Sequence, residues 1–380
     1  MTRRMRILLG GIPLGCDNIG DEAIIAGVVK MLKEAIPDVQ LSVATADAST
    51  ATLLGVEVVP PYGFAGQGIA GFAETASKHD AYIWCGATGL SDYPNVALDL
   101  LEAAQSRNVP TFIWGVGMDT ELNPVFFKVH GRKRWLLSAL RLVDWYERLL
   151  KRRLTKRFAS VLPKCKGVWL RDPESVAMLS SMGYAEARVT ADTAIIVKSN
   201  SVADFNHPAK HTLGICISAQ RQVSDMDGLK GFLEKIRASG IGLLGIPMNP
   251  KTDRPIMEQL GIDCIEGTNP DAVMAAAASC DAVLSSRLHL LILAANVGTL
   301  GMGIARGSKL DNWLANFGMK TLGSVYDCDW NGIAPKVISA VLTPDANWHS
   351  IRNEAYLKLM QRFDSARDEL IVKIARIHEE

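Results

Sequence analysis

The segment Ser285-Ser286-Arg287-Leu288-His289 brings a cation, an imidazole and two hydroxyl groups together directly after an apolar run. The run predicts a strand, and the apolar residues that follow predict a helix. Ligands of open parallel sheets bind at the carboxyl ends of strands, and a helix amino terminus capped by serine favours anions. The segment therefore predicts either an anion site or a structural pair in which the arginine meets a carboxylate.

A second polar segment, rich in glycine, separates the first predicted strand at residues 6–9 from a helix at residues 21–36. Asn18, Gly20 and Asp21 lie at its end. Backbone N–H groups of such a turn can bind an anion or a polar ligand. The spacing matches neither a phosphate loop nor a dinucleotide fingerprint. A purely structural turn, in which Asp21 and Glu22 complement the helix dipole, is the other interpretation.

The elements that position these residues follow from length and pattern. At about 100 to 200 residues per domain, 380 residues predict two domains. Short β-branched runs alternate with helical periods, which indicates parallel α/β sheets. A polar segment at 197–210 fits a linker. We expect a Rossmann-like domain at 1–200, a second one at 201–345 and terminal helices at 346–380, as in the two-domain glycosyltransferase fold called GT-B.

Composition excludes several classes of protein. Lys and Arg number 41 against 40 Asp and Glu, so the net charge of +1 predicts no nucleic-acid partner. The seven cysteines occur in no metal-ligand spacing, and carboxylates and histidines form no evident cluster, so no metal is predicted. The arginine-rich start lacks the apolar stretch of an export signal, and no run reaches the about 18 apolar residues of a membrane span. We expect a cytoplasmic protein.

Several short motifs together resemble the polysaccharide pyruvyl transferase family, over about residues 5 to 320. They occur in the order of that family: Asn18-Ile19-Gly20-Asp21-Glu22, Trp84-Cys85-Gly86-Ala87-Thr88-Gly89, Gly115-Val116-Gly117, Arg171-Asp172-Pro173-Glu174-Ser175 with Leu179, Asp192-Thr193-Ala194, Arg287-Leu288-His289, and Gly303-Ile304 with Lys309.

The resemblance implies a GT-B-like enzyme that moves pyruvate from phosphoenolpyruvate, its co-substrate, to two hydroxyls of a sugar. The acceptor would be a polysaccharide or a lipid-linked glycan, and no cofactor is implied. Arg287 and His289 match the family's catalytic, donor-contacting motif. The donor-binding candidates are Arg287, Ser285, Ser286, Arg171 and Lys309, and the acceptor-binding candidates are Asn18, Gly20, Asp21 and Gly86.

The departures from the family pattern concern the acceptor more than the donor. Gly86-Ala87-Thr88-Gly89 replaces a run of three glycines, and Arg306-Gly307-Ser308 replaces aromatic and acidic residues. Two other functions stay open. A nucleotide-sugar glycosyltransferase of the same fold would need a carboxylate for the donor ribose, for which Glu266 and Asp311 are candidates. A carbohydrate-binding protein without activity would not need both Arg287 and His289.

Residues 128–166 are strongly basic, with 13 Lys and Arg against two carboxylates. Apolar residues recur there at helical spacing, and Trp135 and Trp145 are available as interfacial residues. This pattern predicts a peripheral helix that binds an anionic membrane surface, at the inner face of the membrane. The alternative is a helix with one buried stripe and a solvated basic face.

Overall fold

The structure, a computed structural model, describes residues 4–45, 47–119, 122–199, 210–218 and 223–379. Contacts divide the chain into two compact units. The first consists of Met1–Cys16, Val28–Asp192 and Arg362–Glu380, and the second of Asp17–Gly27 and Thr193–Gln361. The predicted domains were continuous stretches of chain, whereas residues 17–27 belong to the second unit and residues 362–380 to the first. Most of the predicted linker, residues 200–209, lies outside the described residues.

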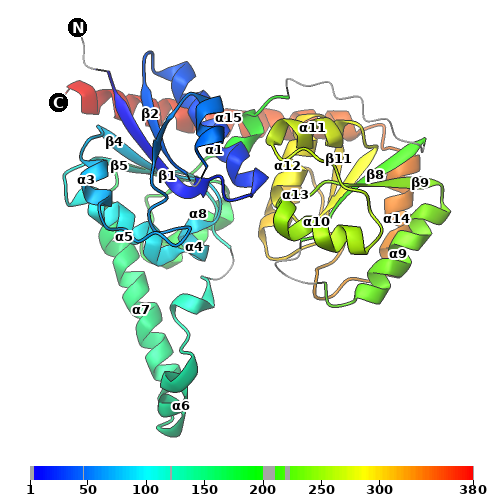
Figure 1. The fold of residues 1–380 in the computed structure, drawn as a ribbon, viewed down its shortest axis with the longest axis horizontal. Helices are drawn as coiled ribbons and strands as arrows, with labels where there is room; N and C mark the ends of the chain where they lie inside the picture. Colours follow the sequence, from blue (N-terminus) through cyan, green and yellow to red (C-terminus); the bar gives the residue numbers. More distant parts are fainter. Residues whose placement is uncertain (1–3, 46, 120–121, 200–209, 219–222, 380) are drawn as a thin grey trace. The chain divides into compact units, whose positions relative to one another are not determined.

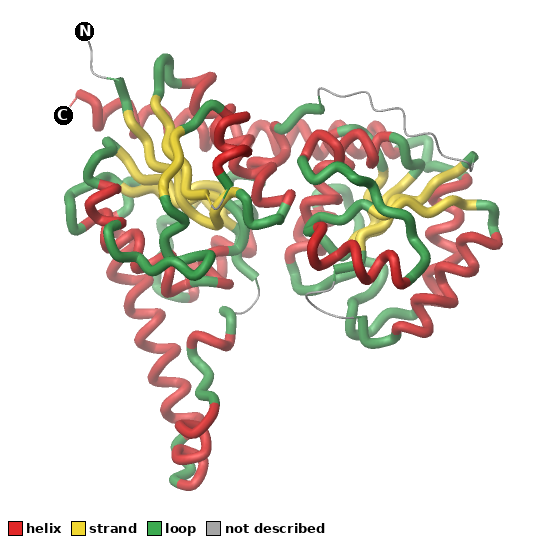
Figure 2. Tube along the Cα trace, in the orientation of Figure 1, coloured by secondary structure: helices red, strands yellow, loops and turns green. Residues whose placement is uncertain are grey.

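The first unit is built on a parallel sheet in the order β3-β2-β1-β4-β5-β6-β7 (Figure 1). Its strands are β1 (Arg6–Leu14), β2 (Gln40–Thr45), β3 (Glu57–Val59), β4 (Ala81–Cys85), β5 (Thr111–Val116), β6 (Gly167–Leu170) and β7 (Arg188–Val189). Every residue of β4 and β5 is buried. Such fully apolar strands are typical of parallel sheets that helices cover on both faces, and Figure 2 shows helices around this sheet.

The helices of the first unit vary in length. They are α2 (Ala48–Leu54), α3 (Phe72–Ala76), α4 (Gly89–Asp92), α5 (Pro94–Gln105), α6 (Gly131–Ala139), α7 (Val143–Val161), α8 (Pro173–Ser181), the second half of α1 (Ile19–Ala35) and the end of α15 (Trp348–Glu379), with short 3-10 turns at Pro124–Phe126 and Leu162–Lys164. The core contains Trp84, Phe158 and Leu170 among its fully buried side chains.

The first strand is longer than predicted, because it continues through the glycines assigned to a turn. Gly10 and Gly11 pair with Trp84 and Cys85 of β4. A Cβ on Gly11, whose φ is +116°, would lie 2.1 Å from the Cys85 carbonyl oxygen. Glycine is therefore needed here for the close approach of two strands. The prediction also missed β3, a short strand at the sheet edge.

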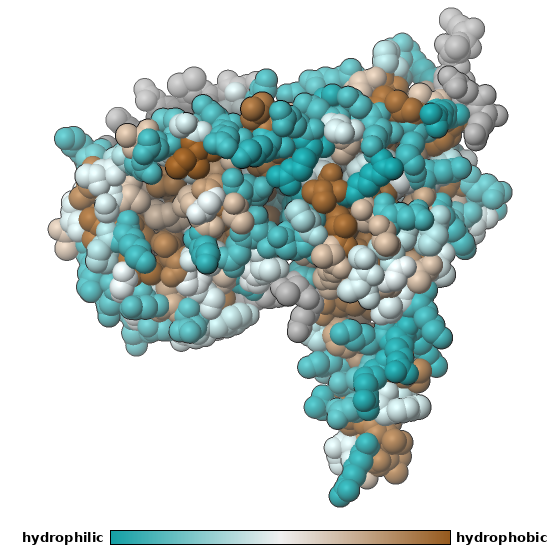
Figure 3. All heavy atoms as spheres, turned by 180° about the vertical axis from the view of Figure 1, so that it is seen from behind, coloured by the Kyte–Doolittle hydropathy of each residue, from teal (hydrophilic) through white to brown (hydrophobic). Residues whose placement is uncertain are grey.

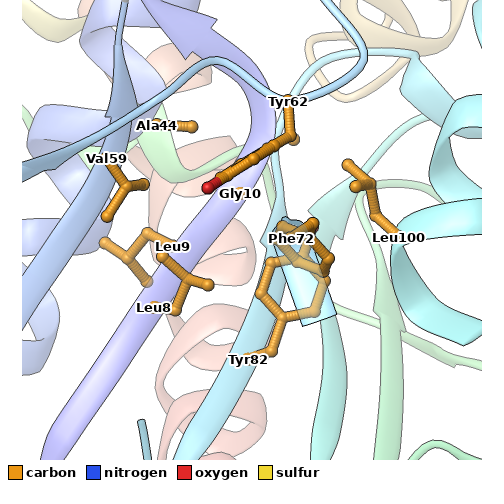
Figure 4. A pocket seen from close by; sticks show the side chains of 10 residues that line it. Leu8, Leu9, Gly10, Ala44, Val59, Tyr62, Phe72, Tyr82 and Leu100 are labelled. Atoms are coloured by element: carbon orange, nitrogen blue, oxygen red, sulfur yellow. The ribbon is translucent and has the colours of Figure 1, made fainter. Parts of the chain in front are cut away.

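A small cavity lies in the core of this unit beside β1 and β4 (Figure 4). Its walls are apolar side chains such as Leu8, Phe72 and Leu100, with the Tyr82 ring beside Gly10. The space holds about one water molecule. It is a packing void of the core, far too small for a sugar or a nucleotide.

The second unit has a parallel sheet in the order β11-β10-β8-β9. Its strands are β8 (His211–Cys216), β9 (Ile241–Gly245), β10 (Ala282–Ser285) and β11 (Leu300–Gly303). The helices are the first half of α1, α9 (Met226–Ala238), α10 (Pro250–Gln259), α11 (Pro270–Ala278), α12 (Leu288–Asn296), α13 (Lys309–Ala315), α14 (Trp330–Leu342) and the start of α15, with a 3-10 turn at Thr193–Ile196. The two Rossmann-like sheets and the carboxyl-terminal helices confirm the predicted α/β class.

The basic segment at 128–166 is not the single helix that we predicted. It forms α6 and α7, joined by a turn in which Arg141 has a φ of +54°. Leu154 and Phe158 of the predicted apolar stripe are buried, whereas Leu136 and Leu140 are exposed. Across the described residues, no helix combines the length and apolar character needed to cross a membrane.

Candidate functional site

The second sheet carries a polar site where its strand order reverses. The chain passes from β8 to β9 on one side and then returns to β10 and β11 on the other. At the carboxyl ends of β8 and β10, the Ser218 backbone N–H donates to the Ser286 hydroxyl at 2.9 Å. Such reversal points are where open α/β sheets bind ligands.

Arg287 follows β10 and is 9% exposed. The Ser285 hydroxyl accepts from the Arg287 N–H at 2.9 Å and donates to the Arg287 carbonyl at 2.8 Å. This local turn fixes the backbone before α12. The predicted capping of α12 by serine is wrong, because Arg287 is the N-cap residue and makes no side-chain cap bond.

The Arg287 guanidinium is held by a carboxylate that the sequence analysis missed. Its Nε and Nη2 atoms donate to the two oxygens of Asp253, at 3.1 and 2.7 Å. Asp253 is fully buried, and it also accepts from the Asn249 N–H at 2.9 Å. A two-pronged pair of this kind fixes the plane of the guanidinium. Thus the alternative of an arginine paired with a carboxylate is observed, and this pair fixes how the guanidinium is oriented.

Two more cations follow the neighbouring strand β11. Arg306 is 8% exposed, and its Nη1 donates to the Ser218 hydroxyl at 3.0 Å. Lys309 begins α13 and is half-buried. Because β10 and β11 are adjacent, Arg287, Arg306 and Lys309 all lie at the same edge of the sheet. In the sequence Arg306 stands out only as a departure from the family pattern, and the structure places it at this carboxyl edge of the sheet.

The segment 17–27, from the start of the chain, belongs to this same unit. The Ile19 N–H donates to the Met248 carbonyl at 2.9 Å, and Lys251 Nζ lies 2.6 Å from an oxygen of Asp17. A Cβ on Gly20 would lie 2.2 Å from His289 Nδ1. Gly20 therefore leaves the space that the imidazole ring occupies.

Asp21 is the most perturbed carboxyl of this cluster. It is 5% exposed, and Asn18 Nδ2 donates to it at 2.6 Å. Burial raises the pKa of Asp21 from 3.8 to about 6, although the charges of His289, Lys309 and Arg287 act in the opposite direction. A carboxyl group with this pKa can exchange a proton near neutral pH.

A family model matches most of the chain. The model of a family described as polysaccharide pyruvyl transferase matches residues 18–308. The chain belongs to the polysaccharide pyruvyl transferase family. The predicted resemblance is thereby confirmed, and the match runs from the segment that holds Asn18 and Asp21 to the loop just before Lys309. A pyruvyl transferase of this family is an enzyme of polysaccharide modification.

Solved structures resemble this family member in fold. A UDP-GlcNAc 2-epimerase from Neisseria meningitidis, bound to UDP-GlcNAc, is 12% identical with a TM-score of 0.58 and covers 98% of this chain and 100% of its own. The UDP-glucose complex of UGT71G1 from Medicago truncatula is 11% identical, with a TM-score of 0.58, and covers 98% of this chain and 99% of its own. The MnaA–UDP structure from S. aureus is 11% identical with a TM-score of 0.58, covering 93% and 91%. The predicted GT-B-like fold is confirmed. A search of curated proteins found no match.

Two predicted site residues of this pyruvyl transferase family member lie in the first unit. Gly86 follows β4 with a φ of +82°, and Ala87 after it has a φ of +49°. Arg171 follows β6, where Nη1 donates to Asp192 and Nε to Asp172. Thus the acceptor-binding candidates are divided, since Asn18, Gly20 and Asp21 belong to the second unit. The predicted assignment of all four to one amino-terminal domain does not match this division.

No group of three or more His, Cys, Asp or Glu side chains suited to a metal ion occurs among the residues that the structure describes. The seven cysteines are not paired in disulfides. The groups available for chemistry at the second sheet are therefore its cations, the imidazole of His289 and the carboxyl group of Asp21, whose pKa is raised.

Proposed function

We propose that the protein transfers pyruvate from phosphoenolpyruvate to two hydroxyls of a sugar, forming a cyclic ketal and releasing phosphate. The acceptor is a unit of a polysaccharide or of a lipid-linked glycan. One observation carries the proposal: Arg287, His289, Arg306 and Lys309 follow the carboxyl ends of β10 and β11, and Asp21 of the same unit lies within the electrostatic influence of His289, Lys309 and Arg287. Membership of the pyruvyl transferase family supports it.

The cations of this edge suit the donor. Phosphoenolpyruvate carries up to three negative charges, on a phosphate and a carboxylate. Arginine binds both groups with paired N–H donors, and lysine adds a point charge. In our proposal Arg287 and Lys309 hold the donor, with Arg306 as a further cation and the amino terminus of α12 beside them. Ser285 and Ser286 keep the loop in place through their bonds to the backbone.

The reaction requires proton transfers that His289 and Asp21 could perform. A proton added to the methylene carbon makes C2 of phosphoenolpyruvate electrophilic, and the first sugar hydroxyl attacks C2 as it loses its proton. Phosphate then leaves, and the second hydroxyl closes the ketal and releases the remaining proton. We assign His289 as the acid and Asp21 as the group that accepts a hydroxyl proton.

Incubation with phosphoenolpyruvate and candidate acceptors, followed by mass spectrometry, tests the proposal. The expected product has gained the mass of pyruvic acid less one water, and one phosphate appears for each product. Acceptors whose hydroxyls are blocked by methylation serve as the control. Product formation that needs a nucleotide sugar instead of phosphoenolpyruvate would overturn the assignment.

A glycosyltransferase that uses a nucleotide sugar is the second candidate, and the fold of the UDP-bound structures favours it. Its predicted ribose carboxylates are otherwise engaged: Asp311 accepts from the Thr321 N–H and hydroxyl, at 3.1 and 2.7 Å. Glu266 pairs with Arg254 at 3.4 Å, and its side chain is almost fully exposed. Thermal shift with phosphoenolpyruvate and with UDP-sugars separates the two candidates.

A further inference from the structure

The helical pair α6–α7 extends away from the first sheet as a projection (Figure 1). Only the second half of α7 packs on the unit, through the buried Leu154, Phe158 and Val161. Arg157 fixes that half to α5, with Nη2 lying 2.7 Å from Asp99 and 2.6 Å from Glu102. The rest of α7 and all of α6 contribute no buried residue.

The projection nevertheless has a defined structure. Lys133 Nζ of α6 donates to the Tyr146 hydroxyl of α7 at 2.6 Å and lies 4.2 Å from the centre of that ring. Arg134 and Glu147 form a second link, at 3.8 Å. Polar contacts therefore link the two helices.

The apolar residues of the projection are turned to solvent around the junction of α6 and α7. Trp135 is 71% exposed, Leu140 66%, Leu136 56% and Trp145 55%. Figure 3 shows hydrophobic residues gathered near the end of the projection, with hydrophilic residues along its sides. Large apolar side chains grouped at an exposed tip indicate a surface that is covered in function.

The charge around this tip is strongly positive. Residues 128–153 contain nine Lys and Arg and two carboxylates, a formal excess of seven, in a chain whose net charge is +1. Of the nine, only Arg134 forms an ion pair with a carboxylate in the described structure. Basic residues that flank exposed tryptophan and leucine are typical of segments that enter the interface of anionic membranes.

We propose that the tip of α6–α7 docks the enzyme on an anionic lipid surface, with Trp135, Leu136, Leu140 and Trp145 entering the headgroup region. Charge disfavours a second copy as the partner, because two tips of this charge repel each other. An acidic polysaccharide would match the charge, but it offers no apolar phase for the leucines. A lipid surface satisfies both features. The inference does not depend on the proposed reaction.

Intrinsic fluorescence provides a direct test, because Trp135 and Trp145 are the two exposed tryptophans among eight, and the other six are buried. The full chain is mixed with vesicles of phosphatidylcholine alone or with one third phosphatidylglycerol. We expect a blue shift and quenching by brominated lipid with the anionic vesicles, both lost at about 0.5 M salt, where charges are screened beyond about 4 Å. The double variant Trp135→Phe with Trp145→Phe should bind without the shift.

Cosedimentation of variants with vesicles measures the contribution of the basic residues and that of the apolar residues separately. Each basic residue near an anionic surface adds about fivefold to binding. Arg132→Gln with Arg152→Gln should therefore weaken binding by about 10 to 30 fold. Leu136→Gln with Leu140→Gln should abolish the apolar contribution. The matched controls are Lys336→Gln with Arg376→Gln, and Leu53→Gln with Leu357→Gln, all exposed residues elsewhere. These controls should bind like the parent.

Other outcomes would contradict docking on a lipid surface. Equal binding to neutral and anionic vesicles, or equal losses in the tip and control variants, would overturn the proposal. A blue shift that grows with protein concentration and needs no vesicles would identify a second copy as the occupant. Salt-sensitive binding to an acidic polymer without a fluorescence shift, combined with no vesicle binding, would identify the polymer.

Discussion

At the carboxyl edge of the first sheet Arg171 lies between two carboxylates, Asp172 and Asp192, at 3.3 and 3.2 Å. At the same edge of the second sheet Arg287 pairs with one carboxylate, Asp253, and two more cations follow the next strand. The two edges share one architecture and differ in their balance of charge. At the first edge two carboxylates hold one arginine. At the second edge one carboxylate holds Arg287, and Arg306 and Lys309 add two more positive charges.

This difference bears on which of the two edges suits the anionic donor of the proposed reaction. In the proposed reaction, the cations of the second edge suit a donor with up to three negative charges, whereas at the first edge the charge of Arg171 is already balanced by Asp172 and Asp192. Arg171 was predicted to bind the donor, and its two carboxylates argue against that role. The predictions below test this division, from the largest expected effect to the smallest.

Replacing His289 with alanine should have the largest effect. Removal of a positioned proton-transfer group typically costs about 10² to 10⁴ in rate. We expect His289→Ala to lower kcat by that order and to change the Kd of phosphoenolpyruvate less. Steady-state kinetics and calorimetric titration measure the two quantities. His289→Gln, which keeps a hydrogen-bonding side chain beside Gly20, controls for loss of packing. A variant that turns over like the parent would remove His289 from the chemistry.

Replacing Arg287 should mainly affect donor binding. Loss of a charge-assisted hydrogen bond costs about 1.5 to 3 kcal/mol, so Arg287→Ala should raise the Kd of phosphoenolpyruvate by about 10 to 150 fold. Because the substitution leaves the buried Asp253 without its partner, Arg287→Ala combined with Asp253→Asn is the better variant for titration. Arg287→Lys keeps the charge and loses the planar geometry. Unchanged donor affinity in all three would place the phosphate elsewhere.

Asp21→Asn should reveal the cost of the buried charge. The folded pKa of about 6 exceeds the unfolded 3.8, so ionised Asp21 destabilises the folded protein above pH 6, by about 3 kcal/mol at most, and this cost disappears towards pH 4. The free energy of unfolding of Asp21→Asn, relative to the parent, should therefore rise between pH 4 and 7 and level off above. Urea unfolding at several pH values measures it. A difference that does not vary with pH would contradict the raised pKa.

The same variant sharpens the division between donor and acceptor. If Asp21 accepts a proton from the sugar, Asp21→Asn loses turnover while its Kd for phosphoenolpyruvate stays within a few fold of the parent. In the parent, kcat should increase with pH through about 6, as Asp21 loses its proton. An Asp21→Asn variant that retains this increase would exclude Asp21 as its source.

Arg171→Lys should have the smallest effect on the donor. The substitution preserves the charge between Asp172 and Asp192 but not the fork of N–H donors, so we expect a lower melting temperature. The Kd of phosphoenolpyruvate should change by less than about twofold, well below one hydrogen bond in energy. Calorimetric titration beside the Arg287→Lys variant makes the comparison. Similar losses in the two variants would show that both edges bind the donor.

Local pattern was sufficient for most of the fold. Strands such as β4 and β5 are apolar at nearly every position, and helices such as α9 carry caps and a regular apolar stripe, so both could be read from sequence. The predicted ends of two elements were wrong. β1 extends through Gly10 and Gly11 because β4 pairs with both, and the basic segment breaks at Arg141 into two helices.

The site was predicted in part, for a similar reason. Arg287 and His289 stand close together in the sequence beside a strand end, so their types and spacing were enough to single them out. Asp253 lies 34 residues from Arg287 in the sequence and carries no motif, and nothing local marks it as the partner of an arginine. Arg306 likewise could be assigned to the site only because β11 and β10 are adjacent in the sheet.

By itself, the sequence determined the α/β class, the family and the candidate cations, since these depend on residue types and their order along the chain. Only the tertiary structure decided that residues 17–27 join the second unit, where Gly20 makes room for His289 and burial raises the pKa of Asp21. The physical reason is that burial and charge pairing depend on neighbours brought together from distant parts of the chain, and these neighbours set the energy of a charge.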